Sequence, residues 1–244
     1  MGRVAVITGA SGALGHAIAR RLARDGYDLA LHYRSGEEEA QRLAVSLQRD
    51  GVRALPVQAD VCRQEEVDAM IRVVEEELGP IAVLVNNAGL VRDRTLARLT
   101  EDDWDVVLDT NLRGAFLLCK ATVPRMRERR AGRVVNISSI VGAMGNYGQI
   151  NYAASKAGLI GLTKSLAREV ARDQVTVNAI CPGFMDTPMV RSVPQTVQEK
   201  LVAQIPLGRF GEPEAVGEAV AYLVGPGGDW VTGQVLHVNG GMYM

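Results

Sequence analysis

The chain has 244 residues, of which 47% are hydrophobic and 23% charged, and its formal net charge is −1. This composition is typical of a globular protein with a sizeable core, and it provides no global attraction to nucleic acid or to an anionic membrane. The three cysteines are scattered and no apolar run is long enough to span a bilayer, so we expect a cytoplasmic protein without disulfides, zinc or a signal peptide.

Short β-branched runs alternate along the chain with amphipathic helical stretches. The predicted strands cover residues 3–8, 28–33, 53–58, 81–86, 132–138, 175–180 and 234–239. Helical patterns lie between the first six runs, as in residues 65–79, where apolar side chains recur at a spacing of three or four. Continuous apolar strands separated by helices indicate a mostly parallel sheet with both faces covered. We therefore predict one domain, residues 1–244, with a Rossmann-like, doubly wound α/β fold of about seven strands.

The stretch TGASGALG, residues 8–15, joins the first strand to the first helix. Gly9 can make the tight turn, Gly12 removes a side chain where backbone approaches phosphate, and Gly15 lets the helix pack against the sheet. The helix N-terminus then offers free N–H groups to a pyrophosphate. The spacing G-x-x-G-x-x-G differs from the common dinucleotide fingerprint, so a purely structural turn stays open as an alternative.

A second motif lies downstream, in NYAASKAGLIG. Tyr152 and Lys156 are four residues apart and share one face of a helix. Ser139 lies thirteen residues before Tyr152, at the end of a predicted strand. Because strands of a parallel sheet end at the ligand crevice, we expect these three side chains to converge there. An ordinary surface pair on a helix is the alternative.

Residues 184–211 interrupt the alternation of strands and helices after the sixth strand. The segment contains three prolines and has weak helical character. Because it follows the carboxyl end of a strand, we predict a substrate lid within the single domain. A surface excursion without function is the alternative.

Taken together, the motifs resemble those of the short-chain dehydrogenase/reductase family over essentially the whole chain. The motifs that carry the resemblance are TGASGALG, NNAG (residues 86–89), Asn111, Ser139, Y-x-x-x-K and PGFMDT (residues 182–187). Within the family, NYAASKAGLIGLTKSLAREVA and LHVNGGMYM are most similar to members that reduce 3-oxoacyl groups on an acyl-carrier protein in fatty-acid synthesis.

The resemblance implies a role for each matching residue. Tyr152 is the general acid that protonates the carbonyl oxygen, and Ser139 hydrogen-bonds that oxygen. Lys156 holds the ribose hydroxyls and favours the tyrosinate, while Asn111 anchors a water relay. Useful acid–base work near neutral pH requires the pKa of Tyr152 to fall by about three, which is about 4 kcal/mol. We expect the charge of Lys156 to supply that effect.

The same resemblance implies a dinucleotide cofactor. The implied cofactor-binding residues are Gly9, Ser11, Gly12, Leu14, Gly15, Arg34, Asp60, Val61, Asn87, Ala88, Gly89, Tyr152, Lys156, Pro182, Gly183, Met185 and Thr187. Ala13 replaces a family glycine, and the arginine that many carrier-protein reductases have in place of Gly12 is absent. The second strand ends in Tyr33-Arg34, where NAD-specific members usually place Asp, so we predict NADPH.

Two of these assignments keep a simpler alternative. Arg34 is a plain solvated charge if it does not pair with the 2′-phosphate. Asp60, which matches an adenine-contacting position of the family together with Val61, also suits a helix N-cap or a turn. The histidines His16, His32 and His237 are isolated along the chain, and we assign them neither metal binding nor catalysis.

A basic cluster marks the end of a long predicted helix. Its members are Arg125, Arg127, Arg129 and Arg130. Arg129, Arg130 and the later Arg172 suit docking of an acidic acyl-carrier protein, whereas a solvated helix end explains the charges equally well. The resemblance also implies a homotetramer, with the apolar end HVNGGMYM at one interface.

The predicted activity is therefore NADPH-dependent reduction of a 3-oxoacyl thioester to the 3-hydroxyacyl thioester. An acetoacetyl-CoA reductase and a broader ketone or sugar-alcohol dehydrogenase share the same catalytic residues and remain open. A non-enzymatic dinucleotide sensor is a remote alternative, because a sensor has no need of the full catalytic set.

Overall fold

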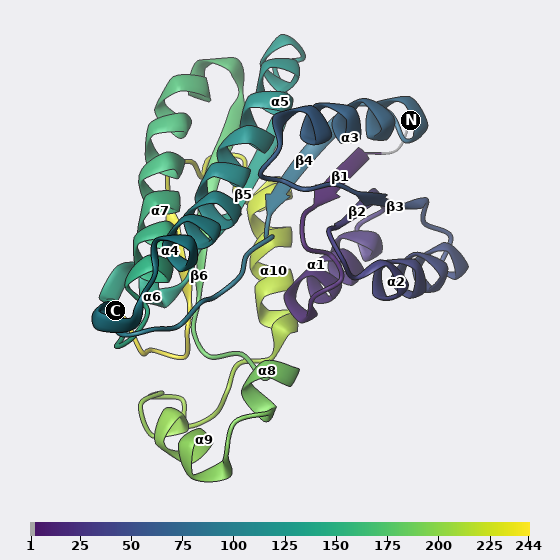
Figure 1. Cartoon of the computed structure of the whole chain (residues 1–244). Helices are drawn as coiled ribbons and strands as arrows, with labels where there is room; N and C mark the ends of the chain where they lie inside the picture. Colours follow the sequence, from purple (N-terminus) through teal and green to yellow (C-terminus); the bar gives the residue numbers. More distant parts are fainter. Residues whose placement is uncertain (1–2) are drawn as a thin grey trace.

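The computed structural model describes residues 3–244. Its seven strands form one sheet in the order β3-β2-β1-β4-β5-β6-β7, and each pair of neighbours is parallel (Figure 1). The strands are β1 (Arg3–Ile7), β2 (Tyr27–Tyr33), β3 (Ala54–Gln58), β4 (Ile81–Asn86), β5 (Gly132–Ile137), β6 (Val175–Pro182) and β7 (Val235–Val238). The predicted strands and the Rossmann-like α/β fold are confirmed.

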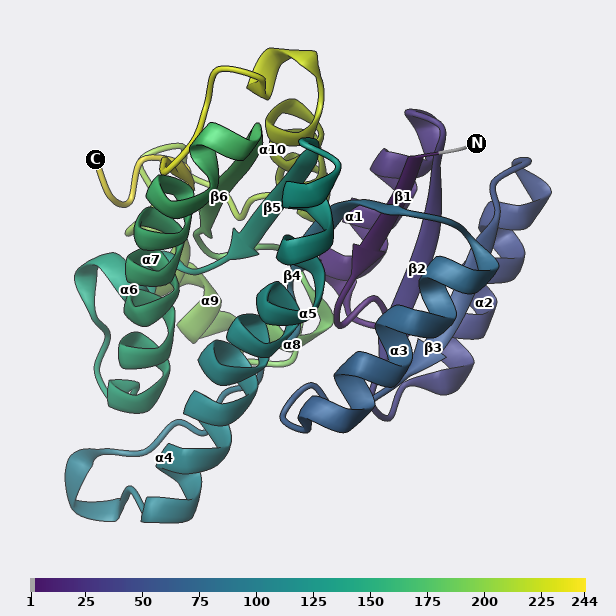
Figure 2. The ribbon, with the colours of Figure 1, turned by 90° about the horizontal axis from the view of Figure 1, so that it is seen from above.

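Helices cover both faces of this sheet, as Figures 1 and 2 show. One face packs against α1 (Ala13–Arg24), α2 (Glu37–Arg49) and α10 (Pro213–Val224). The other face packs against α3 (Gln64–Glu77), α5 (Gly114–Glu128) and α7 (Ile150–Val170). Successive residues of β1 alternate between the two cores, with Ala5 and Ile7 in one and Val4 and Val6 in the other. Both faces are therefore apolar, which is why the strands read as continuous hydrophobic runs.

The remaining segments are short. They are the 3₁₀ turns η1 (Leu96–Arg98), η3 (Ala171–Asp173) and η4 (Pro226–Gly228), the helices α4 (Glu101–Leu108), α6 (Ile140–Met144), α8 (Pro188–Arg191) and α9 (Gln195–Val202), and the π-helical turn η2 (Asp109–Arg113). The turn η2 leads directly into α5. Single π-helical turns inside α-helices are frequent at functional sites, and this one carries Asn111.

The strand order reverses between β1 and β4, so the segments that follow these two strands lead to helices on opposite faces of the sheet and leave a crevice between them. Four segments leave the carboxyl edge of the sheet near it. They are residues 8–15 after β1, residues 87–90 after β4, residues 138–139 after β5 and residues 183–187 after β6. Most motifs singled out in the sequence therefore lie at one edge of the sheet.

A chain of buried amide and hydroxyl groups joins the centre of the sheet to α7. The Asn86 Nδ2 donates to Asn136 Oδ1 at 2.8 Å, and the Asn136 Nδ2 donates to Thr163 Oγ1 at 2.8 Å. All three side chains are at most 4% exposed. Leaving one of these groups unpaired costs roughly 1–3 kcal/mol, so the chain fixes α7 in one register against β4 and β5.

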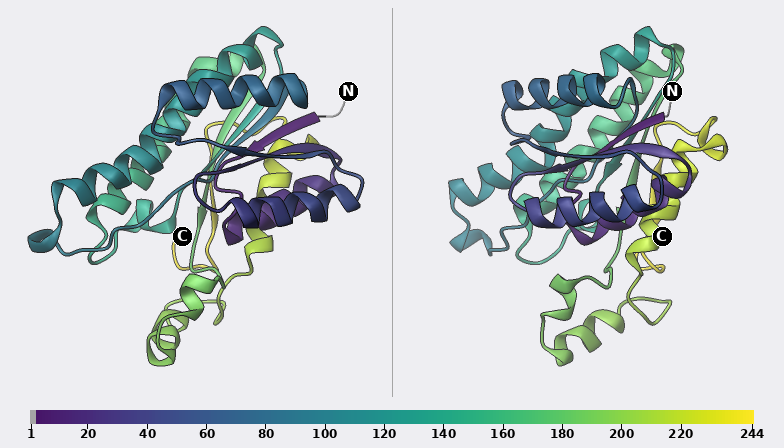
Figure 3. Two further views of the ribbon diagram at one scale, coloured as in Figure 1. Left: turned by 45° about the vertical axis from the view of Figure 1, so that its right-hand side comes forward. Right: turned by 90° about the vertical axis from the view of Figure 1, so that its right-hand side faces the viewer.

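Residues 184–211 extend beyond the carboxyl edge of the sheet. Figures 1 and 3 show α8 and α9 projecting from the carboxyl edge of the sheet. None of the eight residues of α9 is buried. Within residues 3–244, every helix is too short or too polar to cross a membrane. The same residues contain no group of three or more His, Cys, Asp or Glu side chains arranged to hold a metal ion.

Candidate active site

The Gly-rich turn, residues 8–15, is bound directly to the segment that follows β4. The Thr8 Oγ1 accepts from the backbone N–H groups of Asn87 and Ala88, each at 2.9 Å. The Asn87 Nδ2 donates in return to the Thr8 carbonyl at 2.8 Å. Gly9 has a φ of +63°, and a Cβ there would lie 3.0 Å from Ala88 Cα. Glycine is therefore required at position 9, as predicted.

The other two glycines of the turn differ from each other. A Cβ at Gly15 would collide with the Gly9 carbonyl oxygen and lie 2.7 Å from Ala10 Cα. The obstacle is the turn itself and not the sheet, which corrects the predicted reason for Gly15. At Gly12 the φ is −88°, and the nearest atom to a Cβ is 3.5 Å away. No protein atom therefore requires glycine at position 12, the position is open toward a ligand, and the role of Gly12 in letting the backbone approach a phosphate stays a prediction.

Backbone donors of the turn remain available for an anion. Within residues 3–244, the N–H groups of Ser11, Ala13, Leu14 and Gly15 have no acceptor. They surround the N-terminus of α1, where the helix dipole also favours negative charge. The Leu14 side chain packs against the core and leaves its amide at the surface of the turn. This donor set fits the pyrophosphate of a dinucleotide.

The segment after β2 folds onto the same turn. A Cβ at Gly36 would lie 2.7 Å from both Cβ and Oγ of Ser11, so the two backbones approach closely. Arg34 is exposed at the start of this segment, and its carbonyl accepts from Gln58 Nε2 at 3.0 Å. In the described part of the chain, no carboxylate pairs with the Arg34 guanidinium. The charge of Arg34 is therefore free to meet a ligand beside Ser11.

The segment after β3 contains Asp60 and Val61. The Asp60 Oδ1 accepts from the Cys62 N–H at 2.9 Å, whereas the N-cap of α3 is Arg63. Asp60 is thus a turn residue, and its alternative as the helix N-cap is wrong. Val61 is 3% exposed and packs against α5, where a Cβ at Gly114 would lie 2.8 Å from its Cγ2.

Ser139 and Tyr152 meet at the carboxyl edge of the sheet. Ser139 is the N-cap of α6, and its Oγ accepts from the Val141 N–H at 3.1 Å. The same hydroxyl is hydrogen-bonded to the Tyr152 hydroxyl. Burial raises the pKa of Tyr152 above its ordinary value, and the hydrogen bond to Ser139 only partly offsets that effect. The phenol therefore keeps its proton at neutral pH.

Lys156 lies under this pair and is 4% exposed. Its Nζ donates to the Ile137 carbonyl at 2.8 Å and lies 5.6 Å from the centre of the Tyr152 ring. Burial lowers the pKa of Lys156 to about 8. The expectation that Lys156 lowers the pKa of Tyr152 is therefore wrong for this structure. The reason is geometric, because the ammonium is directed at a backbone carbonyl and not at the phenolic oxygen.

Asn111 closes the back of the site. Its Nδ2 donates to the Leu90 carbonyl at 3.0 Å and to Ser155 Oγ at 3.1 Å, and its Oδ1 accepts from the Leu90 N–H at 2.8 Å. A Cβ at Gly89 would lie 3.2 Å from Asn111 Oδ1 and 3.4 Å from Lys156 Nζ. The structure thus brings Asn111, Gly89 and Lys156 together. The polar atoms of Asn111 bind protein groups, so its water relay stays a prediction.

Two residues that the sequence did not single out hold α7 in place. The Ser138 Oγ donates to the Lys156 carbonyl at 2.8 Å. Asn151 is fully buried, and its Nδ2 donates to the carbonyls of Arg92 at 3.1 Å and Asp103 at 2.9 Å. The only signal for these two residues in the sequence is their position, since Ser138 directly precedes Ser139 and Asn151 directly precedes Tyr152. That signal does not reveal their hydrogen-bond partners, which are distant along the chain.

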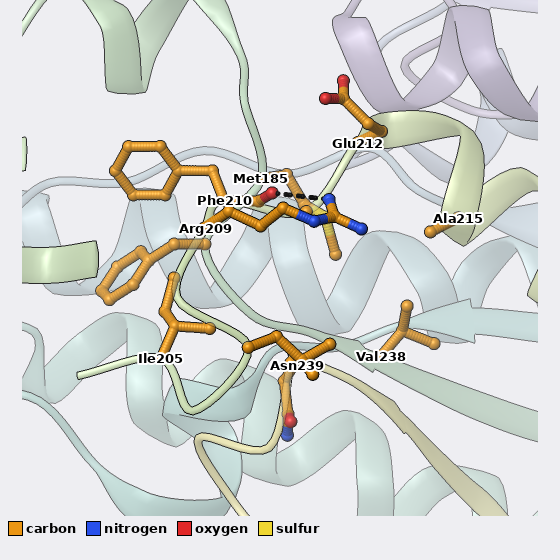
Figure 4. A pocket seen from close by; sticks show the side chains of 12 residues that line it. Met185, Ile205, Arg209, Phe210, Glu212, Ala215, Val238 and Asn239 are labelled. Carbon is orange, nitrogen blue, oxygen red and sulfur yellow. Dashed lines mark hydrogen bonds between the residues drawn. The ribbon is translucent and has the colours of Figure 1, made fainter. Parts of the chain in front are cut away.

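The segment PGFMDT lies against the last strand. The Gly183 N–H donates to the Val238 carbonyl at 2.9 Å, and Pro182 and Met185 are buried. Thr187 directly precedes α8. An apolar pocket opens beside this segment, with Met185, Ile205 and Val238 among its lining residues (Figure 4). Residues 205–212, at the far end of the predicted lid, form its other wall.

The arginine cluster lies at the opposite edge of the sheet. The Arg129 guanidinium donates to the carbonyl of Ile81, the first residue of β4, at 2.7 Å. Arg130 donates to the Arg172 carbonyl at 3.0 Å. Three of the four arginines of the cluster are near carboxylates, in the pairs Arg125–Glu75, Arg127–Asp173 and Arg129–Glu75. Because α5 runs antiparallel to the strands, its C-terminus is remote from Ser139.

Comparison with known proteins agrees with the motifs. A family model described as enoyl-(acyl carrier protein) reductase matches residues 9–243. The 3-oxoacyl-[acyl-carrier-protein] reductase FabG of Staphylococcus aureus (strain Mu50) is 45% identical over 244 residues, which are 100% of this chain and 99% of the relative. The proteins of the same name from Pseudomonas aeruginosa and Vibrio cholerae are 45% and 43% identical over 243 residues, covering 100% of this chain and 98% of each relative.

The buried ammonium of Lys156 predicts an unusual stability profile. Its pKa is 10.5 in the unfolded chain and about 8 in the folded protein, so stability falls as the pH drops from 10.5 through about 8. Below about pH 8 the penalty is roughly 3 kcal/mol. Lys156→Met should therefore raise the free energy of unfolding at pH 7 by about 1–3 kcal/mol, less at pH 10.

Denaturant unfolding at both pH values measures this gain. Lys164→Met, at an exposed position on the same helix, serves as the matched control and should leave stability nearly unchanged. A Lys156→Met protein that is less stable than the wild type at pH 7 contradicts the argument.

Proposed function

This chain belongs to the short-chain dehydrogenase/reductase family, and we propose that it reduces a 3-oxoacyl thioester on an acyl-carrier protein to the 3-hydroxyacyl thioester in fatty-acid synthesis. The observation that carries the proposal is the pair of hydroxyls of Ser139 and Tyr152, side by side above Lys156 at the edge of the cofactor crevice. The names of the curated relatives support the substrate class.

The two hydroxyls suit the oxygen of a ketone. Both can donate a hydrogen bond to it, which stabilises the negative charge that develops on this oxygen during reduction. NADPH bound in the crevice supplies the hydride. Tyr152 holds its proton in the free protein because burial raises its pKa, so the phenol is ready to protonate the oxygen. Lys156, whose Nζ donates to the Ile137 carbonyl, is assigned to the ribose hydroxyls of the cofactor.

Removing the phenol tests this chemistry. Tyr152→Phe should lower kcat with acetoacetyl-CoA by about 100- to 10,000-fold, the usual contribution of a general acid. Consumption of NADPH under saturating substrate measures the rate. Tyr147→Phe is the matched control, because Tyr147 is 88% exposed and lies five residues away. Full activity of Tyr152→Phe rules out Tyr152 as the acid.

We assign cofactor binding to the segments at the carboxyl edge of the sheet. The unpaired amides of the Gly-rich turn hold the pyrophosphate, and the segments that contain Asp60–Val61 and Asn87–Gly89 flank the adenine and ribose. Residues 182–187 lie toward the nicotinamide. Arg34, which is exposed and lacks a carboxylate partner in the described chain, binds the 2′-phosphate of NADPH.

Arg34→Ala should therefore weaken NADPH binding by roughly 10- to 100-fold, the loss expected for a charge-assisted hydrogen bond, and leave NADH binding unchanged. Calorimetric titration with both cofactors gives the ratio. Arg49→Ala, an exposed charge at the other end of α2, controls for net charge. An equal loss of affinity for NADH and NADPH contradicts the assignment.

The segment 184–211 is proposed as a substrate lid within a single domain. Its two helices project beside the site, and the apolar pocket at its base suits an acyl chain. Movement of α8 and α9 toward Tyr152 encloses such a chain and excludes water from the reacting carbonyl.

Docking of the carrier protein is proposed at Arg130 and Arg172, with a smaller part for Arg129. Arg130 and Arg172 are exposed and have no carboxylate partner in the described chain, whereas Arg129 lies 3.7 Å from Glu75. These residues lie at the amino edge of the sheet, whereas Tyr152 lies at the carboxyl edge. The acyl group of a carrier docked there must therefore reach across the molecule or enter the site of another subunit.

The double change Arg130→Glu and Arg172→Glu should raise KM for acetoacetyl-carrier protein by roughly tenfold. KM for acetoacetyl-CoA should stay constant, because the CoA form makes no contact with the patch. The double change Arg24→Glu and Arg49→Glu makes the same charge change on the other face and serves as control. An equal rise for both substrates removes the docking proposal and favours a CoA-linked or broader ketone reductase.

The assembly is proposed to be a homotetramer. A groove between α5 and α7 is lined by Phe116, Val123, Leu162 and Leu166, and Phe116 is 50% exposed. On another side, Tyr222 of α10 is 50% exposed and Trp230 before β7 is fully exposed. Two separate apolar surfaces give two isologous interfaces, which suffice for a closed tetramer.

Light scattering of the purified protein should return the mass of four chains. Phe116→Glu should reduce it to that of two chains, because a charge in an apolar interface is not tolerated. A monomer at assay concentration contradicts the tetramer.

A further inference from the structure

His32 lies in β2 and is 2% exposed. The backbone N–H of Gly9 donates to its Nδ1 at 3.1 Å, and its Nε2 lies 3.0 Å from the Ala59 carbonyl oxygen. The carbonyl of His32 also accepts from the Ala10 N–H at 2.8 Å. The backbone carbonyl and the ring of His32 therefore both bind backbone N–H groups of the Gly-rich turn.

The partners determine the state of the ring. A backbone N–H only donates and a carbonyl only accepts, so Nδ1 has to be the acceptor and Nε2 has to bear the proton. This is the neutral imidazole in a single tautomer. Both nitrogens are used, and the buried ring has no spare hydrogen-bonding capacity.

The two partners belong to different parts of the proposed cofactor site. Gly9 begins the turn whose free amides face the pyrophosphate, and Ala59 immediately precedes Asp60 and Val61, which are proposed to flank the adenine. The imidazole thereby spans the space between these two segments. Its rigid ring sets their separation more strictly than a flexible side chain could.

We propose that His32 is a positioning residue of the cofactor site, whose neutral ring holds the Gly-rich turn and residues 59–61 at the separation that NADPH requires. The inference rests on the proposed binding of NADPH. It adds a residue outside the motifs, one that touches neither the substrate nor the reacting atoms.

Protonation of His32 breaks the bridge, because a second N–H would then face the Gly9 amide. The charged groups that act on the ring are Asp60, after β3, and Arg34, at the end of β2, while Glu66 of α3 binds the Asp60 amide at 2.7 Å. The turn TGASGALG and the strand β3 contain no ionisable side chain. Burial lowers the pKa of His32 below 6.5, so the bridge is complete above pH 6.5 and is lost as the pH falls through that lower value.

Two substitutions separate the halves of the bridge. In His32→Asn the amide oxygen takes the place of Nδ1 and keeps the hydrogen bond from Gly9, but the side chain is too short to reach the Ala59 carbonyl. In His32→Gln the amide nitrogen takes the place of Nε2 and keeps the Ala59 bond, but Gly9 loses its acceptor. Each variant should raise the Kd for NADPH by roughly 5- to 100-fold, and KM for NADPH should change more than kcat.

The experiment is fluorescence titration of NADPH and NADH into the wild type, both variants and the control His237→Asn, from about pH 8 to about pH 5.5. The wild type should bind NADH with constant affinity from about pH 8 to about pH 6.5 and lose affinity only once the pH falls through the lowered pKa of His32, a loss that the two variants should not show. NADH is included because it lacks the 2′-phosphate, which itself titrates near pH 6. His237→Asn should match the wild type throughout.

Each outcome decides between the proposals. Variants that bind NADPH as tightly as the wild type but unfold at lower temperature give His32 a structural role only and overturn the inference. A wild-type affinity for NADH that already falls between about pH 8 and about pH 6.5, where the ring is neutral, also contradicts it, even if neither variant folds. A wild type that binds neither cofactor overturns the proposed function and this inference together.

Discussion

The site depends on one constraint, which is that all seven strands run in the same direction. Their carboxyl ends then meet at one edge, and the loops that follow β1, β4, β5 and β6 become neighbours. The clearest link is between Thr8 and Asn87, whose side chains bind each other's backbone. Through it the Gly-rich turn and the NNAG segment form one surface, on which a dinucleotide can lie.

Buried polar groups convert this arrangement into a rigid site. Hydrogen bonds among Asn86, Asn136 and Thr163 connect α7 to the sheet. The hydrogen bonds of Ser138 to the Lys156 carbonyl and of Lys156 to the Ile137 carbonyl connect α7 to the carboxyl end of β5. Each of these groups is costly to bury, and each is stable only because a partner is held in place. Burial therefore lowers the pKa of Lys156 to about 8, which makes its charge unfavourable in the folded protein. Burial raises the pKa of Tyr152, which keeps its phenol protonated.

Much of this was predictable from the sequence. Apolar strands separated by helices admit little besides a parallel sheet, and a serine at the end of β5 can then meet Tyr152. The pKa of Tyr152 was not predictable, because it depends on burial and on the carbonyl that attracts Lys156. The hydrogen bond of Arg129 to the Ile81 carbonyl at the far edge of the sheet likewise follows from the packing of distant segments. His32 gave no signal, since its partners are backbone groups of two other segments.

The family model that matches is described by enoyl reduction, whereas the curated relatives are named for 3-oxoacyl reduction. Two adjacent hydroxyls suit a ketone oxygen, which needs a proton, better than a carbon–carbon double bond. The most direct measurement is mass spectrometry of the acyl group after incubation with NADPH that carries a transferable deuteride, using 3-oxoacyl- and enoyl-carrier protein in parallel. The account predicts a 3-hydroxy product with deuterium on carbon 3 and no change in the enoyl substrate. Deuterium in the acyl chain of the enoyl substrate, with the 3-oxo substrate unchanged, would contradict it.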